Sequence, residues 1–392
     1  MLGNKRSAKC LVHTLELTPY VKAMRRVYAT GLQSNVLKAA VPKIQGVLDK
    51  MIEIVEGQRS EGAVDFQALC VKMTLDVIGV VAFETNLGGL DGSRAVYQGI
   101  IDVGHYLTSQ IYNPFRVLYK KLFPRSKAAQ QDEKLLDDLT AEWDKLMKEI
   151  IAREDVPGDG EPIWSGLKQF VDPETGKALV DDSFLTEVAF VVLAGMDTTG
   201  HQLAWILALL ASNPDKAEKL VGELTSRGLC GEDARNVAFD DLAELPYLTA
   251  IIKEGMRIAH VLLTAMLRKV PRDMNILGYN VPAGTRIIFP STRYMCAEAE
   301  WGDPDVFRPE RWLSGEDMSQ KSYLGFSYGP RDCVGQRLAM MEMRVALIRL
   351  VSKYQLSPTV PFEKLTEDVR DGIAIEAKNG IWLNVSPLGH VA

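Results

Sequence analysis

The sequence predicts a mainly α, α+β fold: one large helical domain with small β-sheets toward the C-terminus. Most of the chain before His260 has helical periodicity, whereas short β-like runs separated by turn residues follow Leu263. With 392 residues, 47% of them hydrophobic, the chain can bury a large core. Because the motifs described below need residues from the middle and the end of the chain to meet, we expect a single domain over residues 20–388.

The helical part begins with a basic, then mixed segment and continues through periodic apolar stretches. Asp65 is placed to cap the first of these stretches. Asp182 or Ser183 is placed to cap the longest one, which Asn213-Pro214 ends. The expected segments are Tyr20–Glu56, Phe66–Phe83, Gln130–Arg153, the long helix through Leu210, and Pro246–His260.

The later part predicts short strands. Runs over Val270–Leu277, Thr285–Pro290 and Thr292–Met295 are β-like and alternate with turn residues. Near the end, Ile373–Ala377 and Ile381–Val385 flank an Asn-Gly turn, which is typical of a β-hairpin.

Charge and cysteine content exclude several classes of protein. The chain has 45 Lys and Arg against 51 Asp and Glu, a net charge of −6, which disfavours nucleic-acid binding. Its five cysteines are widely spaced and form no CxxC, which disfavours a disulfide framework or a structural zinc site and favours a reducing compartment.

No signal peptide or membrane span is expected. Basic residues near the N-terminus precede no apolar run. Val188–Ala211 approaches the length of a membrane span, but Asp197, His201 and Gln202 interrupt it. We expect this stretch to be a buried helix of a globular domain.

The strongest local signal surrounds Cys333. Gly329 and Gly335 allow a tight turn and the approach of a flat ligand, and the residues after Gly335 are strongly helical. Cys333 therefore precedes a helix N-terminus, where the helix dipole and free N–H groups favour a thiolate. A buried structural cysteine in a Gly-rich turn is the simpler interpretation of such a residue.

A second motif lies inside the long helix, at Ala194-Gly-Met-Asp197-Thr198-Thr199. Gly195 weakens the helix and opens space beside it, and Thr198 can donate to the carbonyl of Ala194. An unpaired buried carboxylate at Asp197 would be costly, which points to a function for it. The alternative is that a core helix simply tolerates these residues.

A third motif pairs Glu254 with Arg257, three residues apart on one predicted helix. Such pairs are usually solvated surface contacts, and the same spacing occurs elsewhere in the chain. Downstream, Arg311 lies in the segment Phe307-Arg-Pro-Glu-Arg-Trp312.

Together these residues resemble the cytochrome P-450 superfamily. The residues Phe326, Gly329, Arg331, Cys333 and Gly335 match every fixed position of its heme signature FxxGxRxCxG. The long helix resembles the family's oxygen-activation motif, and Glu254, Arg257 and Arg311 resemble its ExxR and PERF/PERW segments, in the family's order.

The resemblance implies that the chain binds heme b, with Cys333 as the iron ligand and Phe326, Gly329 and Gly335 shaping the heme loop. It implies that Arg331 and Arg268 contact heme propionates and that Ala194 lies against the heme. Arg25 resembles the arginine of the family's WxxxR helix, although a basic patch on a solvated helix is an equal alternative. Glu254, Arg257 and Arg311 would form a buried structural triad.

The implied activity is that of a heme-thiolate monooxygenase. Thr198 would order the water that delivers protons, Asp197 would feed protons inward, and an NADPH-cytochrome reductase, with cytochrome b5 as a second donor, would supply electrons. One oxygen atom from O2 would enter a small lipophilic substrate. The alternatives are a non-catalytic heme-binding remnant and a family member that rearranges peroxides without a reductase.

The resemblance runs from about Tyr20 to Pro387 and looks eukaryotic in type. Few residues precede the Arg25 helix, so we expect an N-terminally shortened chain. The family suggests the endoplasmic reticulum, but without the anchor helix we expect a soluble or peripheral protein.

Overall fold

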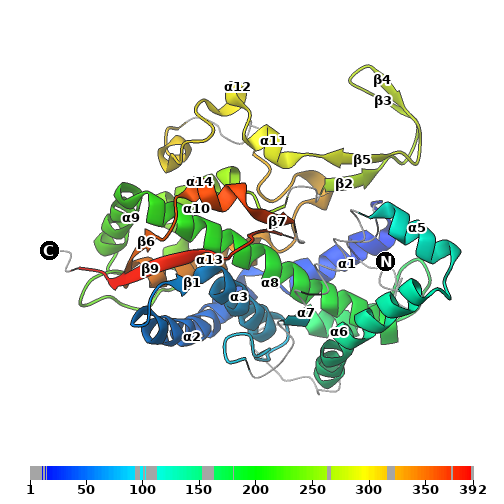
Figure 1. Cartoon of the computed structure of the whole chain (residues 1–392), viewed down its shortest axis with the longest axis horizontal. Helices are drawn as coiled ribbons and strands as arrows, with labels where there is room; N and C mark the ends of the chain where they lie inside the picture. Colours follow the sequence, from blue (N-terminus) through cyan, green and yellow to red (C-terminus); the bar gives the residue numbers. More distant parts are fainter. Residues whose placement is uncertain are drawn as a thin grey trace.

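The computed structural model describes residues 11, 14, 16–92, 98–99, 102, 113–151, 163–179, 181–262, 266–315, 323–371 and 374–389. Helices dominate these residues (Figure 1). The α-helices are α1 Pro19–Thr30, α2 Ser34–Arg59, α3 Phe66–Ala82, α5 Pro114–Leu122, α6 Lys127–Ile151, α7 Ile163–Lys168, α8 Asp181–Ser212, α9 Pro214–Ser226, α10 Pro246–Ile258, α11 Ser291–Met295, α12 Glu298–Trp301, α13 Gln336–Val351 and α14 Phe362–Glu367. Short 3₁₀ helices are η1 Asp240–Ala243, η2 Pro309–Trp312 and η4 Gly329–Arg331.

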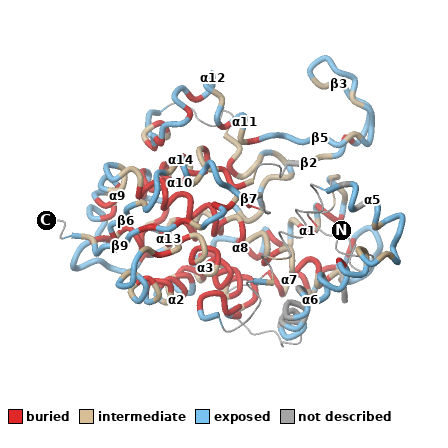
Figure 2. The backbone as a smooth tube through the Cα atoms, viewed as in Figure 1, coloured by how far each residue is buried: buried red, intermediate tan, exposed pale blue. Residues whose placement is uncertain are grey.

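The core lies around α8, which crosses the middle of the molecule against α3 (Figure 1). Two glycines of α8 allow this close packing. A Cβ added to Gly195 would lie 2.9 Å from the Ile78 side chain, and one added to Gly200 would lie 2.6 Å from the Val71 Cα. The Thr74 hydroxyl of α3 also donates to the Met196 carbonyl of α8, over 2.8 Å. Buried residues accordingly concentrate along α3 and α8 (Figure 2).

Helix ends follow the expected signals in part. The Asp65 side chain accepts hydrogen bonds from the N–H groups of Gln67 and Ala68, so it caps α3 as predicted. The long helix α8 ends at Ser212, just before Asn213-Pro214.

The strands form four small antiparallel sheets. The largest has three strands in the order β1-β9-β6, and the others are the pairs β2-β5, β3-β4 and β7-β8. Their bounds are β1 Val64–Asp65, β2 Met266–Lys269, β3 Met274–Ile276, β4 Tyr279–Val281, β5 Arg286–Phe289, β6 Tyr354–Pro358, β7 Val369–Asp371, β8 Ile375–Ala377 and β9 Trp382–Pro387. The predicted mainly α, α+β class, with small sheets late in the chain, is confirmed.

Two predicted strand features are wrong. The run Thr292–Met295 lies in helix α11. The predicted hairpin across Asn379-Gly380 does not form, although Gly380 makes the expected turn, with φ of 78° and its N–H donating to the Ala377 carbonyl. Strand β8 pairs instead with β7, and β9 pairs with β1 and β6. Strand β6, which is longer than β8, and strand β1, from the N-terminal part of the chain, form hydrogen-bond ladders with β9. No local sequence pattern predicts these two pairings.

Candidate functional site

The loop before α13 carries Cys333. The Cys333 N–H donates to the Phe326 carbonyl over 2.9 Å, which closes the loop. Gly329 has φ of 81°, a left-handed conformation that favours glycine, and Gly335 caps the helix that starts at Gln336. Cys333 is a free cysteine with accessible surface, directly before a helix N-terminus.

Burial and the helix N-terminus have opposite effects on the Cys333 thiol. Burial by surrounding protein atoms raises the pKa of the Cys333 thiol. The N–H groups of Gly335 and Gln336, and the charge of Arg25, lower this pKa but do not outweigh the burial. The N–H groups at the helix terminus therefore act in the direction expected from the sequence, whereas burial opposes them, so a positive partner is needed to outweigh the burial.

Three arginines from distant segments converge on this loop. Arg25 of α1 donates to the Asp332 carbonyl over 2.7 Å and pairs with the Asp332 carboxylate at 2.5 Å. Arg268 of β2 donates to the Arg331 carbonyl over 3.5 Å. The pKa of Arg331 is lowered first by burial and then by the charges of Arg268 and Arg25, so the three cations lie close enough to repel.

Arg331 also holds the N-terminal segment. Its Nη1 donates to the carbonyls of Thr14 and Glu16, over 2.8 and 3.0 Å, and its Nη2 donates to the Leu11 carbonyl over 3.2 Å. These bonds use three of the five N–H groups of a guanidinium.

A heme b group fits this arrangement. The carboxylates of two propionates would offset the mutual repulsion of the three arginines, and an iron cation would supply the positive partner that the Cys333 sulfur needs. Among the described residues, no group of three or more His, Cys, Asp and Glu side chains could hold a metal ion.

Helix α8 presents the second motif. The Thr198 hydroxyl donates to the Ala194 carbonyl over 2.8 Å, as the sequence predicts. Asp197 is buried and fully engaged: Oδ2 accepts from the Ala374 N–H over 2.8 Å, and Oδ1 lies 3.2 Å from His201 Nδ1. The expected open space beside Gly195 is absent, because Ile78 of α3 fills it.

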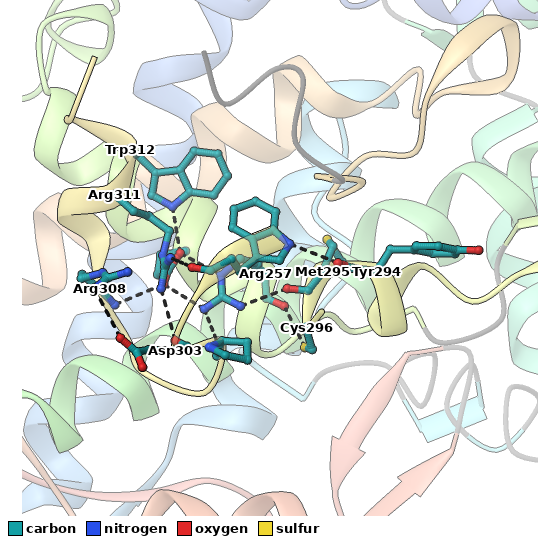
Figure 3. A network of polar contacts seen from close by, with 11 residues as sticks. Arg257, Tyr294, Met295, Cys296, Asp303, Arg308, Arg311 and Trp312 are labelled. Carbon is teal, nitrogen blue, oxygen red and sulfur yellow. Dashed lines mark hydrogen bonds and ion pairs between the residues drawn. The ribbon is translucent and has the colours of Figure 1, made fainter. Parts of the chain in front are cut away.

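Glu254 is the centre of a buried network, and Figure 3 shows its partners Arg257, Arg311 and Trp312. Its carboxylate accepts from Arg257 Nε and Nη2 at 3.0 Å each and from Arg311 Nε at 2.8 Å. It also accepts from Trp312 Nε1 over 2.9 Å and from the Arg308 N–H over 3.1 Å. The structure thus brings together the three residues that the sequence places in a triad.

The remaining donors of the two triad arginines reach backbone carbonyls. Arg257 donates to Met295 over 3.0 Å and to Pro304 over 2.7 Å, and Arg311 donates to Trp301 over 2.7 Å. The network therefore fastens the segment after β5 to α10 (Figure 3). Buried charges are tolerated when their partners are satisfied in this way.

Helix α1 connects the cysteine loop to α8. Its Arg25 binds Asp332, beside Cys333, while the hydroxyls of Tyr20 and Tyr28 donate to the Glu187 carboxylate of α8. Glu187 also accepts from the Leu11 N–H over 2.8 Å. Burial raises the pKa of Glu187, although these three hydrogen bonds lower it in part.

Sequence reasoning missed several polar partners. His201 was noted only as an interruption of an apolar stretch, although its position four residues after Asp197 places both on one helix face. Glu376 and Glu187 gave no local signal, because their partners come from distant segments. Within the described residues, no helix has the length and apolarity required to cross a membrane.

Comparisons with known proteins agree with this geometry. The cytochrome P450 family model matches residues 8–383. Cytochrome P450 4ae1 of Drosophila melanogaster is 28% identical over 366 residues, covering 87% of this chain and 71% of the relative. Leukotriene-B4 omega-hydroxylase 3 of Mus musculus is 33% identical over 218 residues, covering 55% of this chain and 40% of the relative.

The fold is also that of a solved cytochrome P450, CYP102L1. The two structures align with a TM-score of 0.78 at 18% identity, over 96% of this chain and 84% of the other. The family match over most of the chain shows that this protein belongs to the cytochrome P450 family, the heme-thiolate monooxygenases that bind heme b.

Proposed function

We propose that this chain holds heme b through the Cys333 sulfur and inserts one oxygen atom from O2 into a small lipophilic substrate. The observation that carries the proposal is the convergence of Arg25, Arg268 and Arg331 around the loop of Cys333. Three cations against the single carboxylate of Asp332 leave positive charge at this loop that suits the two propionates of one heme.

When bound, heme supplies the redox chemistry of oxygen activation, which side chains alone cannot perform. The chain's own residues position the group. Phe326, Gly329 and Gly335 shape the loop that presents the sulfur, and Ala194 is the α8 residue assigned to the heme face. The Glu254–Arg257–Arg311 network keeps the segment before this loop in place.

Proton delivery is assigned to α8. Oxygen activation consumes protons, so a buried site needs groups that pass them inward. Asp197 is a buried carboxylate and precedes Thr198 in the chain, whose hydroxyl bonds back to its own helix. Asp197 would hold and release the proton, and Thr198 would order the water that carries it.

The electron donor assigned to this reaction is an NADPH-cytochrome reductase, with cytochrome b5 as a second donor. The activity named for one relative, a leukotriene-B4 omega-hydroxylase, supports a lipophilic substrate.

The test is turnover with isotopically labelled O2. Full-length chain loaded with heme is mixed with NADPH, purified reductase and a panel of lipophilic compounds that perturb its heme spectrum. The expected product carries one labelled oxygen atom, and Thr198→Ala should release more hydrogen peroxide for each NADPH consumed. Turnover with organic hydroperoxides alone would favour the peroxide-rearranging alternative, and a chain that binds heme but turns over nothing would favour the remnant.

A further inference from the structure

One stripe of α8 contacts the β7–β8 hairpin through three successive turns of the helix. Asp197 accepts from the Ala374 N–H over 2.8 Å, and Trp205 Nε1 donates to the Ile375 carbonyl over 3.2 Å. His201 lies between them on the same face and meets Glu376.

Four charged groups form a continuous row along this contact. His201 Nδ1 lies 2.8 Å from the backbone carbonyl of Asp197 and 3.2 Å from Asp197 Oδ1, and its Nε2 lies 3.5 Å from Glu376 Oε2. Arg370 of β7 donates to Glu376 Oε1 over 3.3 Å. Side-chain exposure rises outward, from 3% at His201 and 12% at Glu376 to 47% at Arg370, so the row leads from the core to solvent.

The imidazole carries a positive charge at neutral pH. Burial by itself would lower the pKa of His201, but its contacts with Asp197 and Glu376 outweigh burial and raise the pKa to about 10. Among the described residues, the titratable groups that face His201 are Asp197 from its own helix and Glu376 from β8, with Arg370 of β7 behind Glu376.

A purely structural role explains this charge poorly. The bonds from Ala374 and to Ile375 already fasten the hairpin to α8 without any added ion. A buried ion triad holds elements together no better than apolar packing of similar volume. The row also ends at Asp197, the residue that precedes Thr198 in α8, and the proposed function assigns proton delivery to these two residues.

We propose that His201 supplies protons to Asp197 and that Glu376 orients and stabilises the charged imidazole for this transfer. In each transfer the His201 Nδ1–H bond breaks and an Asp197 Oδ1–H bond forms. No electron moves, and an imidazolium and a carboxylate become an imidazole and a carboxylic acid. Solvent then returns one proton to His201. This inference rests on the proposed function, because it assigns the source of the protons that Asp197 delivers.

The first test measures the protonation of His201 directly. The chain has five histidines, so selective ¹⁵N labelling with His201→Gln as the assignment variant identifies its signal in the diamagnetic ferrous carbon monoxide complex. We expect an imidazolium through neutral pH that titrates near 10, and a titration shifted toward 6.5 in Glu376→Gln. A wild-type signal that titrates at or below 6.5 would overturn the proposal.

The second test follows oxygen reduction and needs no substrate. Peroxide release consumes two protons and two electrons for each O2, whereas full reduction to water consumes four of each. With NADPH and purified reductase, we expect His201→Gln and Glu376→Gln to raise the fraction of consumed O2 that leaves as hydrogen peroxide, because the proton-dependent step slows roughly tenfold or more. In both variants this fraction should rise with pH across the neutral range, whereas the wild type should stay constant until His201 loses its proton.

Trp205→Phe is the matched control. It removes a hydrogen bond to the same hairpin, one helical turn away, without removing a charge. It should lower stability and leave the peroxide fraction and its pH profile at the wild-type values. An effect of Trp205→Phe equal to that of His201→Gln, or no effect of His201→Gln, would contradict the proposal. Loss of the proposed function itself would be recognised separately, as a wild-type chain without the spectrum of thiolate-bound heme.

Discussion

A single buried carboxylate, that of Glu254, holds several distant segments of this molecule together. Glu254 has no exposed surface and accepts five hydrogen bonds, three from the side chains of Arg257 and Arg311. Glu310, the neighbour of Arg311, is partly exposed and pairs with Lys216 and Lys219. The two carboxylates therefore differ in burial while belonging to the same region, which makes them a useful comparison.

Glu254→Gln should lower the free energy of unfolding by about 3–5 kcal/mol, because two buried guanidinium groups lose their counter-charge. The variant should also retain less heme after gel filtration. Glu310→Gln should cost at most about 1 kcal/mol, since solvent screens its ion pairs. Chemical unfolding of both variants measures the difference, and equal losses would show that burial of the Glu254 network contributes nothing special.

Two buried histidines should give opposite pH dependence. Burial lowers the pKa of His260 to about 4, below its unfolded value of 6.5. Between pH 4 and pH 6.5, His260 binds a proton in the unfolded chain but not in the folded one. The contribution of neutral His260 to the free energy of unfolding is therefore fully present above pH 6.5 and decreases as the pH falls toward 4. His201 has a raised pKa of about 10, so its contribution is complete below 6.5 and is lost as pH rises through 10.

For each histidine, the free energy of unfolding can change by up to about 1.4 kcal/mol per pH unit within its range. Unfolding measured across pH should show His260→Leu removing the acid-side slope and His201→Gln removing the alkaline-side slope. If His260→Leu left the acid-side slope unchanged, the assigned protonation state of His260 would be wrong.

At the scale of elements, local chemistry predicted the helices better than the strand pairings. The Asp65 cap and the Asn213-Pro214 stop are short-range signals, and α3 begins and α8 ends where these residues place them. The Asn379-Gly380 turn also forms, yet its flanking strands pair elsewhere, because pairing depends on partners far away in the chain.

The contact between α3 and α8 shows the same limit. The sequence marked Gly195 as unusual, but only the structure shows that Ile78 occupies the expected space. Gly200 meets the backbone of Val71, which cannot move aside as a side chain can.

Gly200→Ala should therefore cost about 1–3 kcal/mol, because the added methyl group forces α3 and α8 apart. Gly222→Ala is the control: Gly222 lies in α9 with open space beside it, and alanine there should stabilise by about 0.5–1 kcal/mol. Thermal unfolding distinguishes the two substitutions by the sign of the change. A stabilising Gly200→Ala would mean that the two helices do not approach as closely as described.

For the whole molecule, the motifs of the sequence predicted which residues gather, but not how they are joined. Cys333, the three arginines and the Glu254 network come from segments before and after the long helix. Their link to α8 runs through α1, which binds Asp332 at one place and Glu187 at another. No local pattern signals such a connection, because each contact joins residues that are remote in the chain.

The central claim is that Cys333 binds heme iron as a thiolate. The most direct measurement is the absorption spectrum of the ferrous carbon monoxide complex of the full heme-loaded chain, compared with Cys333→Ser and with Cys296→Ser, a second accessible free cysteine. We predict the strongly red-shifted Soret band of thiolate ligation in the wild type and in Cys296→Ser, and its loss in Cys333→Ser. A wild-type spectrum without this band, or a Cys333→Ser variant that keeps it, would contradict the account.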